Sequence, residues 1–556
     1  MPDTTPQALR YREVAWRHLR EEVFDVLVIG GGINGAGVAR DAALRGMSVA
    51  VIERGDFASG TSSRSSKLIH GGVRYLEYGE IGLVLESCRE RELLRSKLAP
   101  HLVRAQPFVF PIYDDDDMPV WQLRAGLTLY DTLAGLRNVH VHRSLSRDQL
   151  LRDEPALAAD GLMGGALYYD CWTDDARLTV ETMVAARDCG ATVLNYSEVV
   201  ELEKDSAGRL AGARIRDCIS GRTTRARARC FINVTGPWID RVRKLDDAGA
   251  PPRLRLTKGV HAVFDRSKIG NRDAIVIRGA GDHRVMFAIP WQDKTLVGTT
   301  DTYFEGDPAK VAADADDIEY ILATVNTCFP DAGVTATDIV STYAGLRPLV
   351  APEDDMSESA ISREDQIFES PSGLISLGGG KLTTHRHVAE RLTTVVGKRI
   401  GRQAGRCRTA QVALPGAAGI APGGVLSEPP ESFEEHLRWR YGARGPEVAA
   451  LSRDDEALRQ PIVSDLPDLA AEVAYAVEHE MALTLRDVLE RRLHIHLRSR
   501  ERTSDVARRV ADLMAGRLGW DDKRRSEEVE RYMRAVGGDD AVLEEAARRA
   551  SAREDS

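Results

Sequence analysis

The sequence predicts an α/β fold, with a doubly wound domain and a separate helical domain at the C-terminal end. Residues 24–29 are an apolar, β-branched run of buried-strand length, and glycines follow at once. The middle of the chain alternates strand-like and helical segments, which is typical of α/β proteins. From Pro415 to Pro430, eight of sixteen residues are Pro or Gly, and no convincing strand follows. We therefore expect two folded parts joined by a linker.

Composition narrows the functional classes. Hydrophobic residues make up 43% of the 556 residues and charged residues 29%, which is the balance of a globular protein. The net charge of −10 argues against a general nucleic-acid binder. The seven cysteines contain no CxxC pair, so we expect reduced thiols in a cytosolic protein. The sequence has no uninterrupted apolar run of about eighteen residues, which excludes a transmembrane helix but not attachment to a membrane surface.

Apolar runs and the positions of glycine and proline predict the elements and domains in order along the chain. Residues 1–22 are a polar N-terminal extension, with a short amphipathic helix expected at 7–20. A βαβ unit follows, with strands at 24–29 and 48–53 around a helix at 36–44. Further strands are expected at 191–194, 254–263, 274–277, 285–289 and 295–297, with glycine-bounded strand ends at 230–236 and 374–380. Apolar stripes predict a core helix at 121–136 and another helix at 469–489. The domains are then 23–410, a linker at 411–430, and a helical domain at 431–556.

Three glycines after the first strand predict a dinucleotide site. Gly30 permits a tight turn, Gly32 lets the backbone approach a pyrophosphate, and Gly35 lets the helix pack close to the strand. The helix N-terminus then presents free N–H groups to the phosphates. Glu53 ends the second strand and is an acceptor suited to the ribose hydroxyls. A glycine-rich turn without a ligand does not explain this acidic residue.

The loop after Glu53 predicts contact with a second phosphate and a flat ring. Small hydroxylated residues at 61–66 precede the pair Gly71 and Gly72. A serine-rich surface loop is the plain alternative, but residues 68–72 are too apolar for an exposed linker.

Several segments together resemble FAD-dependent glycerol-3-phosphate dehydrogenases of the aerobic, quinone-linked type. Residues 29–41 and 45–46 look like the first family signature, and residues 65–77 look like the block after it. Residues 233–238, 258–261, 289–291, 298–301 and 343–348 are similar to later blocks. Residues 379–386 resemble the second signature, with His385 where the family has Tyr. The resemblance runs in order over residues 24–390, with further similarity at 475–477 and 484–487.

The resemblance implies a D-amino-acid-oxidase-like fold, in which the FAD-binding domain is interleaved with an antiparallel-sheet substrate domain. It implies oxidation of sn-glycerol 3-phosphate to dihydroxyacetone phosphate, with a hydride passing to flavin N5 and electrons passing to a quinone. Because a quinone lies in lipid, we expect peripheral attachment to the inner face of the cell membrane. A homodimer is one expected assembly. The implied FAD-binding residues are Gly30, Gly31, Gly32, Ile33, Asn34, Gly35, Glu53, Arg54, Thr61, Ser62, Ser66, Lys67, Leu68, His70, Gly72, Gly236, Trp238, Gly379, Gly380, Lys381, Leu382 and Thr383.

The same resemblance implies the residues that react with substrate. Arg74, Tyr75, His261, Arg347 and Lys381 match substrate-binding positions, and arginine suits a phosphate dianion because its planar fork donates two parallel hydrogen bonds. The last three are the expected catalytic residues. We expect His261 to accept the hydroxyl proton, since an unperturbed histidine pKa of about 6.5 gives a limb of the pH–rate profile near neutrality. A helix from residue 382 onward, after three glycines, is expected to point N–H groups at the flavin's pyrimidine edge.

Other functions stay open at this stage. An oxidase that uses oxygen differs only in its electron acceptor. An amine or amino-acid oxidase of the same fold needs a carboxylate pocket, which three substrate-side cations disfavour. A non-catalytic flavin-binding regulator leaves His261 and Arg347 unexplained. Three HxH pairs, which begin at His140, His385 and His494, lack the further ligands of a metal site, so we expect no metal.

Overall fold

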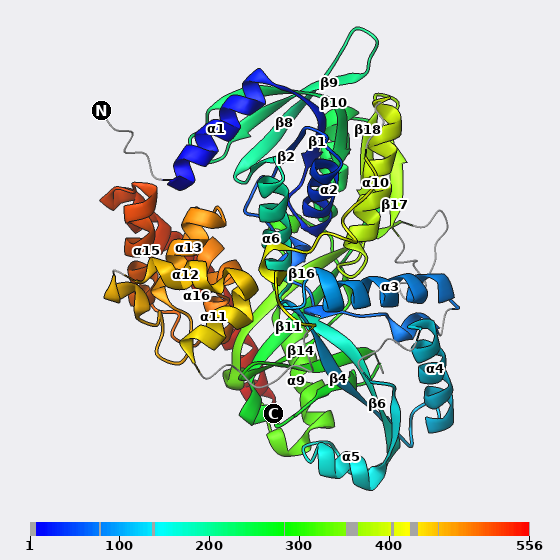
Figure 1. The fold of residues 1–556 in the computed structure, drawn as a ribbon. Helices are drawn as coiled ribbons and strands as arrows, with labels where there is room; N and C mark the ends of the chain where they lie inside the picture. Colours follow the sequence, from blue (N-terminus) through cyan, green and yellow to red (C-terminus); the bar gives the residue numbers. More distant parts are fainter. Residues whose placement is uncertain are drawn as a thin grey trace.

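The structure, a computed structural model, describes residues 7–76, 79–135, 140–282, 284–351, 365–401, 405–422, 432–453 and 455–554. Two sheets and a group of C-terminal helices make up the molecule, with the first sheet at the top of Figure 1 and the second below it. Strands of the two sheets alternate along the chain, so the two α/β parts are interleaved. The α/β prediction and the all-helical C-terminal part are confirmed. Among the described residues, no helix combines the length and the apolar character needed to cross a membrane.

The first sheet has the strand order β17-β18-β10-β1-β2-β7, with β9 paired to β10 and β8 to β9. Its strands are β1 (Val23–Ile29), β2 (Val49–Ile52), β7 (Thr192–Leu194), β8 (Ser197–Lys204), β9 (Leu210–Asp217), β10 (Thr223–Asn233), β17 (Gln366–Glu369) and β18 (Leu374–Gly378). Strands β18, β10, β1, β2 and β7 run parallel. Buried apolar side chains of α2 (Ile33–Leu44), α6 (Asp175–Asp188) and α10 (His385–Arg399) cover one face. The other face is covered by α1 (Gln7–Glu21), α7 (Ile239–Asp246) and the β8–β9 hairpin.

The second sheet is mostly antiparallel, in the order β15-β11-β14-β13-β12-β4-β6-β3, with β16 beside β11 and β5 beside β6. Its strands are β3 (Leu68–Ile69), β4 (Val103–Tyr113), β5 (Arg143–Ser146), β6 (Leu162–Thr173), β11 (Leu254–Asp265), β12 (Ala274–Arg278), β13 (Val285–Trp291), β14 (Lys294–Gly298), β15 (Thr302–Tyr303) and β16 (Ile339–Val350). The helices around it are α3 (Ile81–Leu93), α4 (Val120–Leu133), α5 (Arg147–Asp153), α8 (Arg266–Ile269) and α9 (Ala315–Cys328). The five strands expected between 191 and 297 are all present: the first is β7 of the first sheet, and the other four are β11, β12, β13 and β14. Most of their residues are buried.

The C-terminal helices are α11 (Phe433–Tyr441), α12 (Gly445–Leu451), α13 (Ala470–His479), the π-helical turn η12 (Asp487–Arg492), α14 (Ile495–Arg498), α15 (Ser504–Leu518) and α16 (Asp522–Glu554). They enclose an apolar core of their own. The single helix predicted at 469–489 is wrong: α13 ends at His479, and Met481 then takes a left-handed φ of 58°. The apolar stripe continues across this break because both pieces pack into the same core.

Two other predicted segments differ in part from the structure. The helix expected from residue 382 begins at His385, after a turn at 381–384. The helix expected at 121–136 is α4, whose Leu123, Leu127 and Tyr130 are buried as predicted, while Leu136 lies outside the described residues.

The predicted linker is only partly described. Residues 423–430 lie outside the described part of the chain. At 415–417 the chain forms a short 3₁₀ helix, and the buried Gly416 donates its N–H to Glu181 of α6 at 2.7 Å. This first part of the segment is therefore packed against the α/β body, and the predicted domain boundary stays a prediction.

Candidate cofactor and substrate site

The turn between β1 and α2 is built from backbone contacts that only glycine permits. Gly30 has a φ of +113°, in the left-handed region that favours glycine. A Cβ atom on Gly35 would lie 2.0 Å from the carbonyl oxygen of Gly30. The helix therefore starts directly against the end of the strand, and the N–H of Ile33 donates a 2.9 Å hydrogen bond to Ser62 Oγ of the following loop.

Glu53 stands at the end of β2, beside this turn. Its carboxylate accepts hydrogen bonds from the N–H of Gly31 at 2.6 Å and of Gly55 at 2.7 Å. Burial raises the pKa of the Glu53 carboxyl, while these two N–H groups act to lower it. Each carboxylate oxygen keeps a lone pair for a further donor such as a ribose hydroxyl.

A cavity of about 550 Å³ runs from this turn along the loop that follows Glu53. Thirteen of the predicted cofactor residues line it: Gly30, Gly32, Ile33, Asn34, Glu53, Arg54, Thr61, Ser62, Gly236, Trp238, Gly379, Gly380 and Leu382. Gly31 and Gly35 lie just behind the lining and shape the turn. The other predicted cofactor residues, Ser66, Lys67, Leu68, His70, Gly72, Lys381 and Thr383, are not part of the lining.

Lys67 makes a different contact from the expected one. Its ammonium lies 2.7 Å from Asp175 Oδ1, and neither side chain is exposed to solvent. The Lys67 side chain therefore points away from the cavity and into the protein. Thr383 Oγ1 likewise bonds the backbone of His70, which joins the start of the α10 segment to the loop.

His261 is buried on β11 and lies parallel to Tyr343 of β16, with ring centroids 4.7 Å apart. Its Nε2 lies 2.9 Å from Ser66 Oγ. Within the described part of the chain, Nδ1 has no hydrogen-bond partner. Burial, with the charges of Arg347 and Lys67, lowers the pKa of His261 to about 3. The expected ordinary pKa near 6.5 is therefore corrected: the free ring is neutral at physiological pH because a charged one would lose its hydration next to two cations.

Arg347 lies on β16 at the register position opposite Thr257 of β11. Its guanidinium bonds Asp301 Oδ1 at 2.8 Å and Thr299 Oγ1 at 2.9 Å. A Cβ atom on Gly259 would lie 2.6 Å from Arg347 Nη2, so this glycine makes room for the cation. The arginine is held in place while a quarter of its side chain stays exposed.

Lys381 supplies a second cation, which lies over the ring of Tyr75. The Lys381 ammonium lies 3.8 Å from the centroid of the Tyr75 ring, a cation–π contact. Tyr75 and the half-buried Arg74 belong to the 3₁₀ turn η2 (Val73–Leu76), which directly follows the Gly72 turn. Gly380 carries a φ of +102° and packs against Asn34, so Lys381 begins at the edge of the cavity.

Comparison with known proteins identifies the family. Residues 25–393 match the family described as FAD dependent oxidoreductase, and residues 407–525 match the C-terminal domain of alpha-glycerophosphate oxidase. The aerobic glycerol-3-phosphate dehydrogenase of Staphylococcus haemolyticus (strain JCSC1435) is 38% identical over 499 residues, which cover 86% of this chain and 88% of that protein. Glycerol-3-phosphate dehydrogenase 2 of Mycobacterium tuberculosis (strain ATCC 25618 / H37Rv) is 40% identical over 535 residues, which cover 94% and 90%. The chain belongs to the FAD-dependent glycerol-3-phosphate dehydrogenase family.

A solved structure of this family has the same fold. Glycerol-3-phosphate dehydrogenase from Bacillus halodurans, solved with FAD, aligns with a TM-score of 0.77 at 31% identity, over 95% of this chain and 97% of that one. L-alpha-glycerophosphate oxidase from Mycoplasma pneumoniae aligns with a TM-score of 0.52 at 16% identity, which shows a shared fold alone.

FAD is the cofactor of this chain, and the cavity fits it. Asn34 Oδ1 and the indole nitrogen of Trp238 are both buried in the lining. Neither has a hydrogen-bond partner within the described ranges, and a buried polar atom of this kind is costly unless a ligand satisfies it. The glycine turn, the Ser62 loop and Glu53 supply the close backbone approach and the acceptor that a dinucleotide needs.

Six lining residues of the cavity come from the C-terminal helical domain, and none of them was predicted from the sequence to bind the cofactor. They are Thr484, Arg486, Arg491, Glu528, Arg531 and Tyr532. Thr484 and Arg486 lie in the segment 484–487 that resembles the family, but nothing in the sequence assigns them to the cavity, because polar side chains on a helical domain usually indicate a solvated face.

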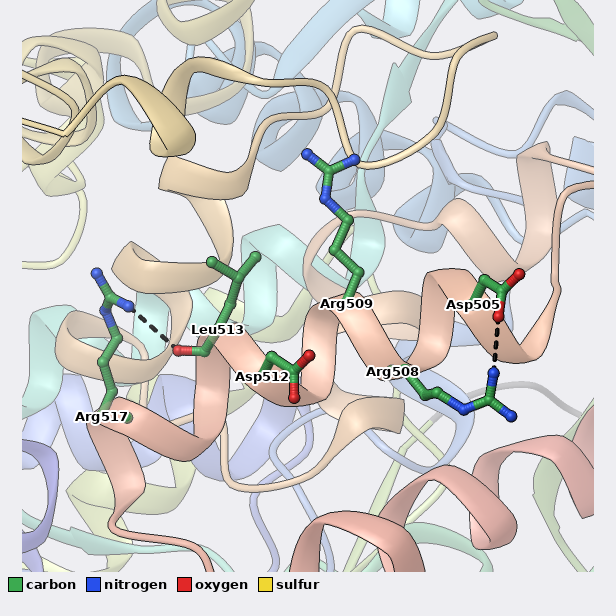
Figure 2. Close-up of a pocket in the computed structure, with 7 residues that line it drawn as sticks. Asp505, Arg508, Arg509, Asp512, Leu513 and Arg517 are labelled. Carbon is green, nitrogen blue, oxygen red and sulfur yellow. Dashed lines mark hydrogen bonds and ion pairs between the residues drawn. The ribbon is translucent and has the colours of Figure 1, made fainter. Parts of the chain in front are cut away.

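A second hollow, of about 500 Å³, lies along α15 at the surface of the helical domain. Figure 2 shows its acidic and basic side chains, with Asp505 bonded to Arg508 at 2.7 Å and Arg517 reaching the carbonyl of Leu513. Its lining contains only Asp, Arg, Leu and Gly, and we assign it no chemistry.

The glycine turn generates a test with a matched control. Gly35→Ala forces a Cβ atom against the Gly30 carbonyl, so we expect the purified variant to retain little FAD, measured as flavin absorbance per protein. In the control Gly82→Ala, on α3, the added Cβ meets no atom within 4 Å, and the change is expected to stabilise the helix by up to about 1 kcal/mol. Full flavin occupancy in Gly35→Ala would contradict this account of the turn.

Proposed function

We propose that this protein oxidises sn-glycerol 3-phosphate to dihydroxyacetone phosphate and passes the electrons to a quinone. One observation carries the proposal: a buried neutral His261 and the cation Arg347 share one face of the β11–β16 pair. Lys381, at the cavity edge, adds a second cation. A base beside a phosphate-binding arginine suits an alcohol that carries a phosphate group.

Arg347 is proposed to hold the substrate phosphate. Asp301 and Thr299 fix the orientation of the guanidinium before any substrate arrives, which reduces the conformational entropy lost on binding. Asp301 neutralises part of its charge, and a phosphate dianion is a stronger partner than one shared carboxylate. Arg74 is proposed to assist from η2.

His261 is proposed to take the proton from the C2 hydroxyl. The ring is fixed by stacking on Tyr343 and by Ser66. Because the ring is buried, its unprotonated nitrogen is shielded from water and can accept the proton of the substrate hydroxyl. When bound, FAD supplies the two-electron acceptor for the C2 hydrogen. Lys381 and the backbone at Gly379 and Gly380 lie at the cavity edge, where positive potential stabilises negative charge that develops during the reaction.

We also propose that the protein attaches peripherally to the inner face of the cell membrane. Helices α3 and α4 contact each other on one side of the molecule (Figure 1). They expose Ile81 at 49%, Leu85 at 50%, Trp121 at 71% and Leu129 at 41%. Ile81 and Leu85 are one helical turn apart, and Trp121 and Leu129 are two turns apart, so each pair lies on one side of its helix. An apolar surface that includes tryptophan suits the interface of a bilayer.

The phosphate role predicts a change that depends on the substrate. We expect Arg347→Ala to raise KM for glycerol 3-phosphate by roughly 10²-fold, with a smaller effect on kcat, because the contact exists in both the ground and transition states. Glycerol is the control substrate: its kcat/KM should be equally poor in wild type and variant. Equal losses with both substrates, in an assay with a soluble quinone analogue, would mean that Arg347 does not bind the phosphate.

The base role predicts where activity is lost with pH. The His261 pKa is lowered to about 3, so the free ring is neutral above that pH. The limb of the kcat/KM pH profile that depends on His261 should therefore lie in acid and not near pH 6.5. His261→Asn should lower kcat by roughly 10²–10⁴-fold and abolish that limb. A limb near pH 6 from the second ionisation of the substrate phosphate should persist in both proteins. A limb near neutrality that is present in wild type and absent from His261→Asn would instead show that His261 has its ordinary pKa of about 6.5.

The membrane surface predicts a loss of vesicle binding. The double variant Trp121→Ser, Leu129→Ser should float with anionic liposomes at least roughly 10-fold more weakly than wild type, since each large apolar side chain contributes about 1.5–3 kcal/mol on burial. Ile219→Ser, in the turn between β9 and β10 and 45% exposed, is the control and should float as wild type does. If neither wild type nor control floats and oxygen consumption is fast, an oxygen-using oxidase is favoured. Sedimentation of the lipid-free protein measures its mass and so tests the expected homodimer.

A further inference from the structure

The helical C-terminal domain forms part of the wall of the FAD cavity. Thr484, Arg486 and Arg491 contribute to the lining from the segment that includes η12, and Glu528, Arg531 and Tyr532 contribute from α16. We propose that this domain is a working part of the FAD site, on the Glu53 side, and that FAD binding and docking of the domain stabilise each other. The inference requires only the FAD site and is independent of the substrate.

The strongest link between the two parts starts three residues after Glu53. Asp56 lines the cavity and is buried. Its carboxylate accepts hydrogen bonds from Arg491 Nε at 2.7 Å and from Arg492 Nη1 and Nη2 at 2.7 and 3.0 Å. These two guanidinium groups hold the pKa of Asp56 below its usual value despite burial. Neither Asp56 nor Arg492 has an exposed side chain, so undocking would break this buried charge pair.

The end of β7 makes a second set of contacts to the same helices. Strand β7 pairs with β2, so its end lies beside Glu53 at the edge of the sheet. Asn195 Nδ2 donates to the carbonyl of Met481 at 2.8 Å. The next residue, Tyr196, lines the cavity, and its hydroxyl bonds Asp487 at 2.5 Å and Thr484 at 3.0 Å. The residues that form the cavity edge are therefore also the residues that hold the C-terminal domain.

A third contact ties the domain to the helix behind the loop. Arg177 of α6 bonds both carboxylate oxygens of Glu480, at 2.7 and 3.1 Å. Asp174, at the start of α6, accepts from His494 at 3.0 Å. These directional contacts orient the docked domain, so its lining side chains have a defined position toward the cavity.

Thermodynamic linkage makes the proposal measurable in two directions. If the docked domain strengthens FAD binding, bound FAD must stabilise docking by the same factor. The first direction is tested by substitution, and the second by the wild-type protein alone.

Arg486→Gln is the informative substitution, and Arg517→Gln is its matched control. Arg486 lines the cavity and pairs with Glu490, with 42% of its side chain exposed. Glu490 is 13% exposed and also pairs with Arg491 at 3.2 Å, so it keeps a cationic partner when Arg486 is replaced. Arg517 pairs with Glu478 at 2.8 Å and is 25% exposed, in the remote hollow of Figure 2. FAD titrated into the full-length apoprotein and followed by flavin fluorescence should show Kd raised roughly 5–20-fold by Arg486→Gln and unchanged by Arg517→Gln. Equal Kd values in the two variants would count against the proposal.

Hydrogen exchange of the wild-type protein gives the second measurement. Adding FAD should slow amide exchange in 484–492 and around Tyr532, while 505–517 on α15 should not change. Protection confined to residues 25–393 would overturn the proposal. A protein that passes both tests but does not turn over glycerol 3-phosphate would contradict the proposed function only.

Discussion

The buried ion pair between Lys67 and Asp175 holds together the loop on which both halves of the site depend. Neither side chain is exposed, and Asp175 also accepts the N–H and the hydroxyl of Ser65, at 3.0 and 2.7 Å. Asp175 opens α6, where the helix dipole favours a negative charge. Lys67 itself takes a left-handed φ of 57°, and its carbonyl accepts the N–H of Thr173. The loop is thus fixed from both sides: Ser62 faces the glycine turn, and Ser66 faces His261.

Local patterns were sufficient to predict the parts of the fold that depend on neighbours in sequence. The β1–α2–β2 unit follows from an apolar run, three glycines and Glu53, because each requirement is met within about thirty residues, as expected for this motif. Four of the ten strands of the second sheet, β11 to β14, were predicted from strand-like runs, whereas the long strands β4, β6 and β16 were not. Its position between segments of the first sheet followed only from the family resemblance, since strand order depends on pairings between distant segments.

The sequence failed where a side chain has two chemically reasonable partners. The family resemblance implied that Lys67 binds the cofactor, and only the packing of α6 shows that its ammonium pairs with Asp175. The helix predicted across 469–489 is interrupted near Met481, which has left-handed backbone geometry and whose carbonyl accepts a hydrogen bond from Asn195. For the same reason the contribution of Arg486 and Tyr532 to the cavity has no local signal: it arises from contacts between residues that are hundreds of positions apart.

The charge arrangement around His261 is compatible with its proposed role as a base despite the low pKa. Burial is the main cause of the low His261 pKa, and the charges of Arg347 and Lys67 lower it further. Lys67 is matched by Asp175, whereas Arg347 is matched only partly by Asp301. A phosphate dianion bound at Arg347 replaces net positive potential near the ring with negative potential, and an imidazolium is then favoured. Before binding, the same cations keep the ring unprotonated and ready to accept. In the proposed mechanism, the substrate therefore brings the charge that favours proton transfer, and an alcohol without a phosphate does not.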